Sequence, residues 1–304
     1  MQFKFIKYTK LWLTISLAII LIGFGAMVRN QIETGHILNW GIDFTGGSLM
    51  EYQFEDSVTT IVPQELSATI DQVLPSTVSQ ITVTGEGTYL IHARDLTEEE
   101  LTQIREAIHA QYGNFEMLRF TTIGPKIGAT LKQKAMMALA VALIAIVLYI
   151  AYAFRHVPKR VSAWRFGFCA ILALIHDVLI AVGFFAIMRF EIDSLFITAL
   201  LTIIGFSVHD TIVVFDRIRE NLKKQSRDDT FGDIADISLN QTMTRSINTS
   251  ISTLFPLVAL YIWGAPSLHH FIFALIIGII VGTYSSIFIA SPVLTFWQEK
   301  KRIR

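Results

Sequence analysis

Asp210 is an ionisable residue inside an otherwise apolar stretch of sequence, Leu195–Phe215. A helix of that length can cross the hydrocarbon core of a bilayer, which is about 30 Å thick. Placing a charge there costs a few kcal/mol on insertion scales, so an intramembrane carboxyl group is by default a candidate functional residue. The question is which other residue accompanies Asp210 and what the pair does.

A second apolar stretch, Met243–Trp263, carries a stripe of polar side chains. At helical spacing one face combines Arg245, Thr249, Ser252 or Thr253, and Pro256, with Thr242 and Asn248 beside it. Lipid offers no hydrogen-bond partners, so such a stripe must face protein or water. Successive membrane helices run in opposite directions, and Asp210 lies about 9 Å from the end of its stretch at 1.5 Å per residue. Arg245 is therefore expected at a similar depth, and we predict that the two residues pair.

Two interpretations of this pair remain open. Desolvation and a neighbouring cation act in opposite directions on the proton affinity of a carboxyl group, so access of water can tip the balance. A pair with this property loads and releases protons, and Thr249 would continue its polar path. Alternatively, Asp210 and Arg245 form a static ion pair that fixes the packing of their helices.

Asp177 lies near the middle of the stretch Phe166–Met188, directly after His176. It is a second candidate for a proton relay, and the alternative is a buried group that only accepts hydrogen bonds. His209, directly before Asp210, is expected to pack or to contact water. Metal ligands on one helix face normally sit at i and i+3 or i+4, so these adjacent pairs predict no metal site. The sequence contains no phosphate-binding loop and no nucleophile triad, so neither a cofactor nor an enzymatic activity is expected.

Six apolar stretches dominate the 304 residues, of which 52% are hydrophobic and 16% charged. They are approximately Leu11–Val28, Ala135–Phe154, Phe166–Met188, Leu195–Phe215, Met243–Trp263 and Phe271–Trp297. Each is about as long as a membrane-spanning helix requires. The first is too long for the apolar region of a signal peptide, and no small-residue cleavage site follows it. We therefore predict an α-helical polytopic membrane protein with six transmembrane helices, the first of them an uncleaved anchor.

Lys and Arg are distributed unevenly between the apolar stretches. They gather at the N-terminus (Lys4, Lys7, Lys10), after the second stretch (Arg155, Lys159, Arg160, Arg165), after the fourth (Arg217, Arg219, Lys223, Lys224, Arg227) and at the C-terminus (Lys300, Lys301, Arg302, Arg304). Since Lys and Arg favour cytoplasmic loops, both termini are predicted to be cytoplasmic and residues from about 29 to 130 to lie outside. The formal net charge is zero, so no nucleic-acid partner is expected, and the single cysteine, Cys169, excludes a disulfide within the chain.

Residues 29–130 have alternating rather than continuous apolar positions. Strands are predicted at Ser48–Phe54, Val78–Thr84, Thr88–Arg94 and Phe115–Thr122, and helices at Pro63–Leu74 and from the capping residue Thr97 to about Tyr112. Gly85-Glu86-Gly87 indicates a hairpin between the middle strands. The order βαββαβ predicts an α+β ferredoxin-like extracytoplasmic domain. The predicted domains are thus the N-terminus with the first transmembrane helix (1–28), the ferredoxin-like domain (29–130) and a five-helix bundle with cytoplasmic loops and C-terminus (131–304).

Two further patterns concern packing. Gly46-Gly47 permits a turn with positive φ before a strand, and we interpret it as a structural turn rather than a ligand site. Gly278, Gly282, Ser286 and Ala290 recur every four residues, a period that lets two helices approach closely, either within the chain or at a subunit interface.

The segment Thr230–Leu239, between the fourth and fifth apolar stretches, is expected to form a short amphipathic turn at the cytoplasmic surface of the membrane.

Four motifs occur in a defined order along the whole chain. They are Trp40–Gly47 (WGIDFTGG), Asp210–Asn221 (DTIVVFDRIREN), Asn240–Ser250 (NQTMTRSINTS) and Gly282–Phe288 (GTYSSIF). Together with six helices and one large loop after the first, they resemble the SecD/SecF family of protein-export membrane proteins, relatives of the resistance-nodulation-division transporters. One of these motifs alone would be a weak signal, whereas four in order are specific.

The resemblance implies an accessory subunit of the Sec machinery in the inner membrane of a bacterium. Such a subunit uses the proton gradient with a SecD partner to promote translocation or release of exported, unfolded polypeptides at the SecYEG channel. The resemblance favours the proton-carrier interpretation of Asp210 and Arg245. It also implies that membrane lipid surrounds the helices. The alternative is half of a proton-driven small-molecule or lipid exporter of the same superfamily. A self-contained exporter of that kind is expected to have twelve helices and larger outside domains.

Overall fold

The computed structural model describes residues 3–54, 61–85, 87–155, 162–224 and 230–299. The chain divides into a helical unit, Met1–Asn39 with Met137–Arg304, and a sheet unit, Trp40–Met136. Several residues used in the predictions lie outside the described ranges: Glu86 of the hairpin, and Lys159, Arg160, Arg227, Lys300, Lys301, Arg302 and Arg304 among the basic residues.

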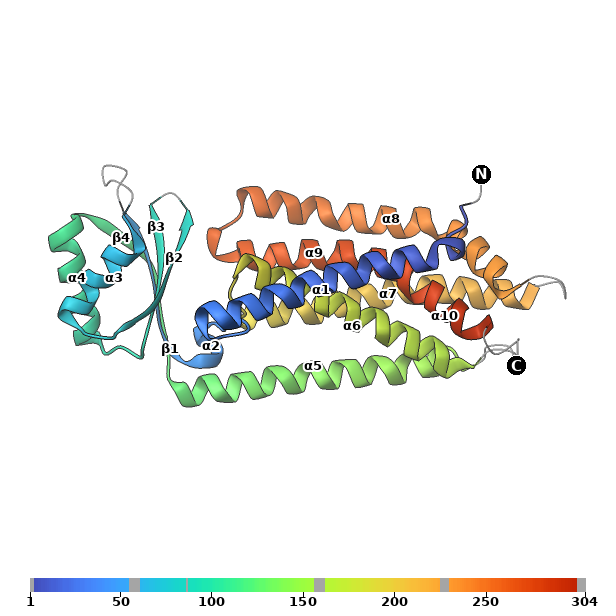
Figure 1. The fold of residues 1–304 in the computed structure, drawn as a ribbon, viewed down its shortest axis with the longest axis horizontal. Coiled ribbons are helices and arrows are strands. Elements are labelled where there is room, and N and C mark those ends of the chain that lie inside the picture. The colour runs from blue at the N-terminus through green and yellow to red at the C-terminus, as the bar shows by residue number, and fades with distance from the viewer. Residues whose placement is uncertain (1–2, 55–60, 86, 156–161, 225–229, 300–304) are drawn as a thin grey trace. The chain divides into compact units, whose positions relative to one another are not determined.

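Six helices within the described residues are long and apolar enough to cross a membrane. The elements of the helical unit are η1 (Ile6–Tyr8), α1 (Thr9–Thr34), α5 (Pro125–Ala153, which begins in the sheet unit), α6 (Ala163–Met188), α7 (Ser194–Lys224), α8 (Phe231–Trp263), η2 (Pro266–Leu268), α9 (His269–Ser285), the π-helical turn η3 (Ser286–Ala290) and α10 (Ser291–Glu299) (Figure 1). The sixth apolar stretch comprises α9, η3 and α10 together. The prediction of a polytopic helical membrane protein is confirmed.

The helix α8 begins earlier than its apolar stretch. Its first residue is Phe231, and a reciprocal capping box precedes it, in which Thr230 Oγ1 accepts from the Asp233 N–H and Asp233 Oδ2 accepts from the Thr230 N–H. A cap of this kind satisfies free amide groups of a first turn, and the helix then continues through Leu239 into the apolar stretch. The prediction of a separate surface turn at Thr230–Leu239 is therefore wrong.

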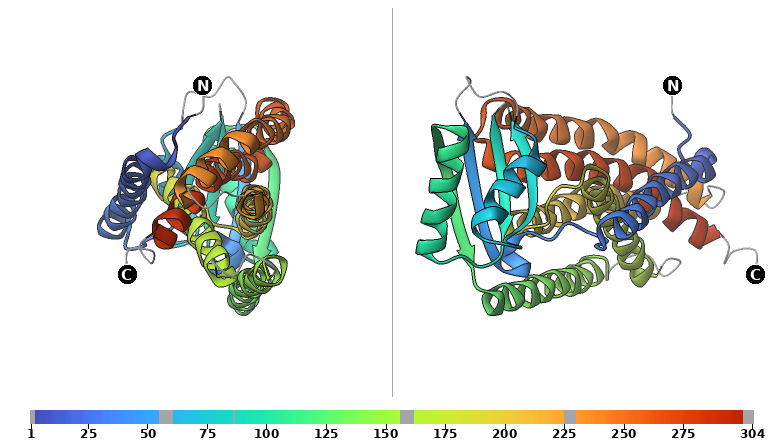
Figure 2. Two further views of the ribbon diagram at one scale, coloured as in Figure 1. Left: turned by 90° about the vertical axis from the view of Figure 1, so that its right-hand side faces the viewer. Right: turned by 60° about the vertical axis from the view of Figure 1, so that its left-hand side comes forward.

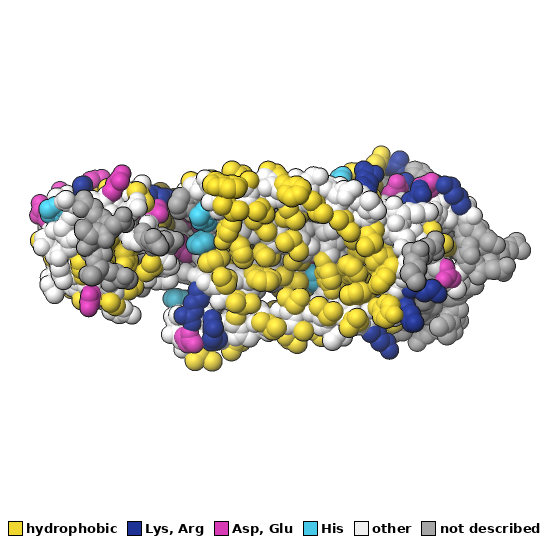
Figure 3. Space-filling model, turned by 90° about the horizontal axis from the view of Figure 1, so that it is seen from above, with side chains coloured by type: hydrophobic (Ala, Val, Ile, Leu, Met, Phe, Trp, Pro, Cys, Tyr) yellow, Lys and Arg dark blue, Asp and Glu magenta, His cyan; other side chains and the backbone are white. Residues whose placement is uncertain are grey.

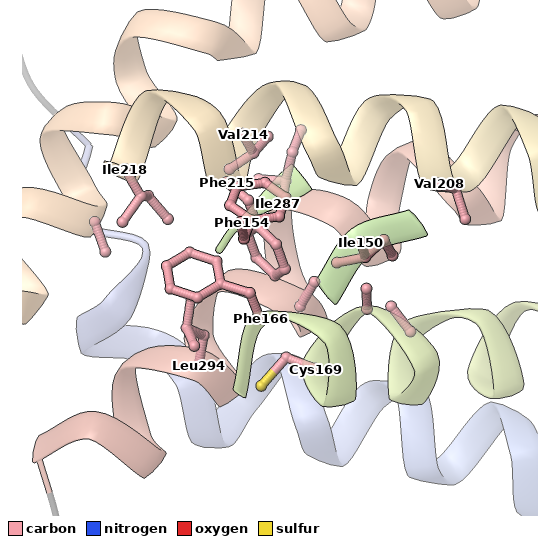
Figure 4. Close-up of a cluster of buried hydrophobic side chains, with 14 of the residues drawn as sticks. Ile150, Phe154, Phe166, Cys169, Val208, Val214, Phe215, Ile218, Ile287 and Leu294 are labelled. Carbon is pink, nitrogen blue, oxygen red and sulfur yellow. The ribbon is translucent and has the colours of Figure 1, made fainter. Parts of the chain in front are cut away.

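The centre of the helical unit is made by α6, α7 and α9. About half of the residues in their apolar segments are buried within the chain (50%, 50% and 56%), against 17%, 6% and 11% in α1, α5 and α8. In the end-on view of Figure 2, α1, α5 and α8 lie at the periphery. Phe166 stacks on Phe154 and meets Phe215 edge to face, with 5.1 Å between ring centroids in both contacts. Figure 4 labels the three side chains among their apolar neighbours. These rings connect α6 and α7 with the residue that follows α5 in one apolar core.

Apolar side chains also cover the outside of the helical unit. Figure 3 shows them over most of one face, with Lys and Arg gathered toward the ends of the helices. Leu148, Phe255 and Trp263 are 61%, 71% and 80% exposed in the chain. An apolar area of this extent is costly in water but not in lipid. We interpret this surface as the one that contacts the bilayer.

The small residues of α9 and η3 face α7 within the same chain. A Cβ atom added to Gly278 would overlap the side chain of Ile203, and one added to Gly282 would lie 3.0 Å from Ser207 Cβ. One turn further, Ser286 Oγ hydrogen-bonds Thr211 Oγ1 at 2.9 Å. Of the two alternatives left open by the sequence, the structure supports close packing inside the chain. The close approach brings polar side chains of both helices within hydrogen-bonding distance.

The sheet unit has the predicted βαββαβ order. Its elements are α2 (Ile42–Thr45), β1 (Gly47–Phe54), α3 (Pro63–Val73), β2 (Val78–Gly85), β3 (Thr88–Ala93), α4 (Glu98–Tyr112) and β4 (Phe115–Ile123). The strands pair antiparallel in the order β2-β3-β1-β4, and α3 and α4 lie on one side of the sheet (Figure 1). Met50 and Tyr52 of β1, Leu66 of α3 and Ile104 of α4 are fully buried between the two layers. The capping box of Thr97 and Glu100 that starts α4 is present. The ferredoxin-like prediction is confirmed.

Gly46 and Gly47 join α2 to β1 where the chain passes close to itself. Gly46 has φ 76° and ψ 169°, and a Cβ atom there would lie 2.6 Å from Pro125 Cα. Gly47 has φ 120°, and its Cβ would lie 2.5 Å from Ala93 O. Both positions thus combine a backbone conformation reserved for glycine with a contact that leaves no room for a side chain. The pair is a structural turn that seats β1 against β3 and the start of α5.

We predict that Gly46→Ala destabilises the sheet unit by about 2–6 kcal/mol, the sum of about 1–3 kcal/mol of backbone strain and about 1–3 kcal/mol of overpacking. Gly113→Ala is the matched control, because Gly113 has a similar backbone (φ 79°, ψ −144°) but no atom within 4 Å of its Cβ position. Hydrogen-exchange protection of the β1 amides in the intact protein measures both. Equal losses in the two variants would show that the Pro125 contact contributes nothing.

Candidate functional site: buried carboxylates between the central helices

Asp210 is held in the interior of the helical unit by a hydroxyl group. It lies on α7 with 4% of its surface exposed, and Ser246 Oγ of α8 donates to its Oδ1 at 2.7 Å. Its second oxygen, Oδ2, is buried and makes no hydrogen bond within the described part of the chain. A buried carboxylate oxygen without a donor is unfavourable, whereas the same oxygen can carry a proton. Asp210 therefore has one fixed and one free oxygen.

Further hydrogen bonds connect Ser246 with α9. Ser250 Oγ, one turn along α8, donates to Ser246 O at 2.9 Å and shares a 2.5 Å hydrogen bond with Thr283 Oγ1. Thr242, Ser246 and Ser250 recur every four residues and are all buried. This row of small hydroxyl side chains is the face of α8 that meets α7 and α9.

Arg245 and Thr249 lie beside that face rather than on it. Arg245 is exposed in the chain, and within the described residues no ion pair joins it to Asp210. Adjacent helical residues point about 100° apart, so Ser246 and Arg245 cannot both face α7. Thr249 is half-buried, and its hydroxyl donates to Arg245 O at 2.9 Å. The predicted direct pair of Asp210 and Arg245 is not formed in this conformation, and the residue that takes its place is Ser246.

Asp177 is the second buried carboxylate, with none of its surface exposed. Its Oδ2 accepts from Ser207 Oγ of α7 at 2.6 Å and from Ser285 Oγ of α9 at 2.9 Å. Its Oδ1 lies 2.9 Å from His176 Nδ1 on its own helix, α6. One side chain thus connects the three central helices. Sequence reasoning identified Asp177 but not its partners.

The two carboxylates are linked to neighbouring residues of α7 and α9. On α7, the Asp177 partner Ser207 is three residues before Asp210, and Thr211 follows Asp210. Ser286 Oγ is bonded to Thr211 Oγ1 at 2.9 Å and lies 3.5 Å from Ser207 O. On α9, Thr283 bonds Ser250, which leads to Asp210 through Ser246, whereas Ser285 bonds Asp177 itself. We call these residues, with Ser246 and Ser250, the hydroxyl network. The π-helical turn η3 begins at its end, and such turns often occur at functional sites.

The hydroxyl residues that contact the two carboxylates were not predicted from the sequence, but they share a recognisable spacing. Ser246 and Ser250 on α8, and Ser207 and Thr211 on α7, stand four residues apart, as hydroxyl groups on one helix face do. They carry no charge, so they are less conspicuous in an apolar helix than Asp177 and Asp210. His209, in contrast, is exposed on α7. Within the described residues, no three His, Cys, Asp or Glu side chains are grouped so that they could hold a metal ion.

A six-helix membrane bundle with intramembrane carboxylates and an inserted ferredoxin-like domain has the features of a multi-pass transport protein. Comparison with known families makes this specific. The model of the family described as "Protein export membrane protein SecD/SecF, C-terminal" matches residues 103–300, and the "SecD/SecF GG Motif" matches residues 38–58. The chain therefore belongs to the SecD/SecF family of protein-export membrane proteins.

Individual relatives agree with this assignment. The chain is 43% identical over 279 residues to the protein translocase subunit SecF of Thermobaculum terrenum, covering 88% of this chain and 87% of the relative. It is 35% identical over 309 residues to the protein translocase subunit SecF of Synechocystis, covering 98% and 95%. The crystal structure of SecDF from Thermus thermophilus superposes with a TM-score of 0.85 at 32% identity. That match covers 98% of this chain but only 39% of the longer SecDF chain. The names of these relatives describe a transport role and not a known class of enzyme.

We predict that Asp177→Leu destabilises the helical unit by about 2–3 kcal/mol, because Ser207, Ser285 and His176 each lose a buried acceptor worth roughly 1 kcal/mol. Asp177→Asn is the matched control. Its amide oxygen accepts from both serines while its NH₂ group faces His176 Nδ1, so the expected loss is below about 1 kcal/mol. Thermal unfolding of the purified protein in detergent compares the two. A loss for Asp177→Asn as large as for Asp177→Leu would contradict the assigned hydrogen bonds.

Proposed function

We propose that this protein is an accessory subunit of the Sec export machinery that uses the proton gradient, together with SecD, to promote translocation or release of exported polypeptides. The observation that carries the proposal is Asp210, a carboxylate buried at membrane depth, with one oxygen held by Ser246 and the other without a hydrogen bond to any residue that the structure describes. If Asp210 served only for packing, both of its buried oxygens would be expected to accept hydrogen bonds. If it accepts and releases a proton, one oxygen must be available to carry that proton.

In the proposed cycle, Asp210 alternates between two partners. When protonated it is neutral, and the hydroxyl of Ser246 is a sufficient partner. When it loses the proton, the carboxylate needs a cation, and Arg245, adjacent to Ser246 on α8, can supply one by turning its side chain inward. Thr249, one turn along α8, continues the polar path, and Asp177 is the second proton-holding residue. The change of partner would shift α8 relative to α7, and with it the extracytoplasmic domain.

The exposed polar side of α8 supports a membrane-embedded partner. Arg245, Asn248 and Ser252 are exposed in the isolated chain although they lie within a membrane-spanning helix. Lipid cannot satisfy such groups, so another protein or water must cover them. In the SecDF crystal structure the region similar to this chain makes up 39% of a longer chain, which leaves room for a SecD part. We therefore propose SecD as the partner of this face, and the SecYEG channel and an unfolded exported polypeptide as further partners.

The proposed location is the inner membrane of a bacterium with both termini in the cytoplasm. The support is the distribution of Lys and Arg along the sequence, which is concentrated in the segments on one side of the predicted helices. In this orientation the sheet unit lies outside, where an exported chain emerges.

The first test concerns this orientation. In a Cys169→Ala background, a cysteine at Thr102, exposed on α4, should react with a membrane-impermeant maleimide added to intact cells from which the outer membrane has been removed. A cysteine at Lys223, exposed near the end of α7, should react only after the inner membrane is permeabilised. Labelling is read by a mass shift. The reverse pattern would refute the proposed orientation.

The second test concerns Asp210. Asp210→Asn keeps the size of the side chain and can still accept from Ser246, but it cannot take up a proton. We expect export to lose its dependence on the proton gradient while co-purification with SecD is retained. Arg245→Lys should also impair gradient-dependent export, since a point charge does not reproduce the planar guanidinium group.

Asp216→Asn is the matched control for this test, because Asp216 lies on the same helix but is exposed and paired with Arg219. It should leave gradient-dependent export within about twofold of the wild type, as is usual for an exposed ion pair. Full gradient dependence in an assembled Asp210→Asn complex would refute the carrier role.

A further inference from the structure

His176 contacts Asp177 on one side and Tyr284 on the other. Its Nδ1 lies 2.9 Å from Asp177 Oδ1, and its ring lies against that of Tyr284 with centroids 6.1 Å apart and planes at 24°. The residue is only 6% exposed, and its Nε2 is buried with no hydrogen-bond partner within the described residues. Buried polar atoms nearly always have a partner, so an imidazole in this position requires an explanation.

Tyr284 extends the contact toward α1. Its hydroxyl group donates to Trp12 O at 3.1 Å and accepts from Ser16 Oγ at 3.2 Å. Ser16 is 3% exposed. Trp12 and Ser16 lie in the first turns of α1, near the end of the helical unit where the N-terminus lies (Figure 1). Polar groups thus lie on both sides of the ring contact between His176 and Tyr284: Asp177 on α6, and Trp12 O and Ser16 in the first turns of α1.

Packing alone explains only part of this arrangement. Tyr284 and Trp12 both contact the ring of Phe288, with centroid distances of 5.1 and 4.5 Å, so an aromatic cluster would be stable there without polar atoms. Burying an imidazole nitrogen that has no hydrogen-bond partner within the described residues is costly unless that atom is used. Both oxygens of Asp177 have described partners, and among these His176 is the only base.

We propose that His176 and Tyr284 are proton-relay residues that connect Asp177 with the first turns of α1. The inference rests on the proposed function, because it extends the same proton route by a further limb. Asp177 gives its proton to His176 Nδ1, which makes the imidazole a cation. The N–H bond at Nε2 then breaks, and that proton passes to the Tyr284 oxygen through one water molecule, since no hydrogen bond joins the two residues directly. For Tyr284 to release its own hydroxyl proton, its hydrogen bond with Ser16 must reverse, so that Tyr284 donates to Ser16 Oγ and the Ser16 hydroxyl passes its proton to a water molecule. His176 and Tyr284 then both end uncharged.

His176→Gln and Tyr284→Phe test this limb in the complete complex with SecD. Each is expected to lower gradient-dependent export at least about tenfold, a conservative value for the loss of a positioned proton donor and acceptor. Co-purification with SecD should be unchanged. Phe288→Leu is the control for packing, since it removes a ring beside Tyr284 but no polar atom. It should remain within about twofold of the wild type in gradient-dependent export.

Chemical rescue separates a relay from a structural role. His176→Ala leaves a cavity that small ring compounds can occupy. Added imidazole should restore at least half of the lost export, whereas pyrrole, of nearly the same size but without a basic nitrogen, should restore none. Equal rescue by both compounds would show that His176 only fills space, and would overturn the proposal.

The outcomes distinguish this inference from the function on which it rests. If Asp210→Asn abolishes gradient dependence while His176→Gln and Tyr284→Phe keep it, the proton route exists but does not use this limb. If Asp210→Asn itself keeps gradient dependence, the proposed function fails first. Should His176→Gln not assemble, Tyr284→Phe decides alone, because it retains the ring and loses only the hydroxyl group.

Discussion

Every polar side chain at membrane depth in this protein must find its partner in protein or water, because hydrocarbon can neither donate nor accept a hydrogen bond. This constraint explains why Asp177 and Asp210 lie on or against the three central helices and not on the outer ones. It also explains why their partners are serines and threonines. A small hydroxyl group satisfies a carboxylate oxygen without adding charge or volume between closely packed helices.

Close packing of α9 on α7 is the condition that makes these contacts possible. Gly278 and Gly282 remove side chains where Ile203 and Ser207 pass, and the same four-residue period then brings Ser286 to Thr211. The hydroxyl network and the small residues of α9 and η3 that recur every four positions are therefore one feature of the fold. Its last residues form the π-helical turn η3, in which the regular ladder of backbone hydrogen bonds is interrupted. A local interruption of this kind is a place where a helix can change direction at moderate cost.

The sheet unit obeys a different constraint. It packs two helices on one side of an antiparallel sheet and needs no lipid to bury its apolar residues. Within this unit, Gly46 and Gly47 join α2 to β1 where the backbone passes within contact distance of Pro125 and Ala93. The glycine motif that marks the family is thus explained by shape and not by ligand chemistry.

The sequence alone determined the architecture. Long apolar stretches predicted the six helices, and alternation with turn signals predicted the four described strands and the helices α3 and α4 of the sheet unit in the right order, because these patterns are local. It also identified Asp177 and Asp210, since a carboxylate in an apolar helix is conspicuous in any fold.

What only the tertiary structure decided was the hydrogen-bond partner of each carboxylate. Arg245 and Ser246 are neighbours in sequence, and the rotation of α8, set by the fit of Thr242, Ser246 and Ser250 against α7 and α9, turned the serine inward and the arginine outward. The same holds for His176 and Tyr284, whose contact depends on how α6 and α9 pack. Local pattern reports which residues share a helix face, but the direction of that face is set by packing between segments far apart in the chain.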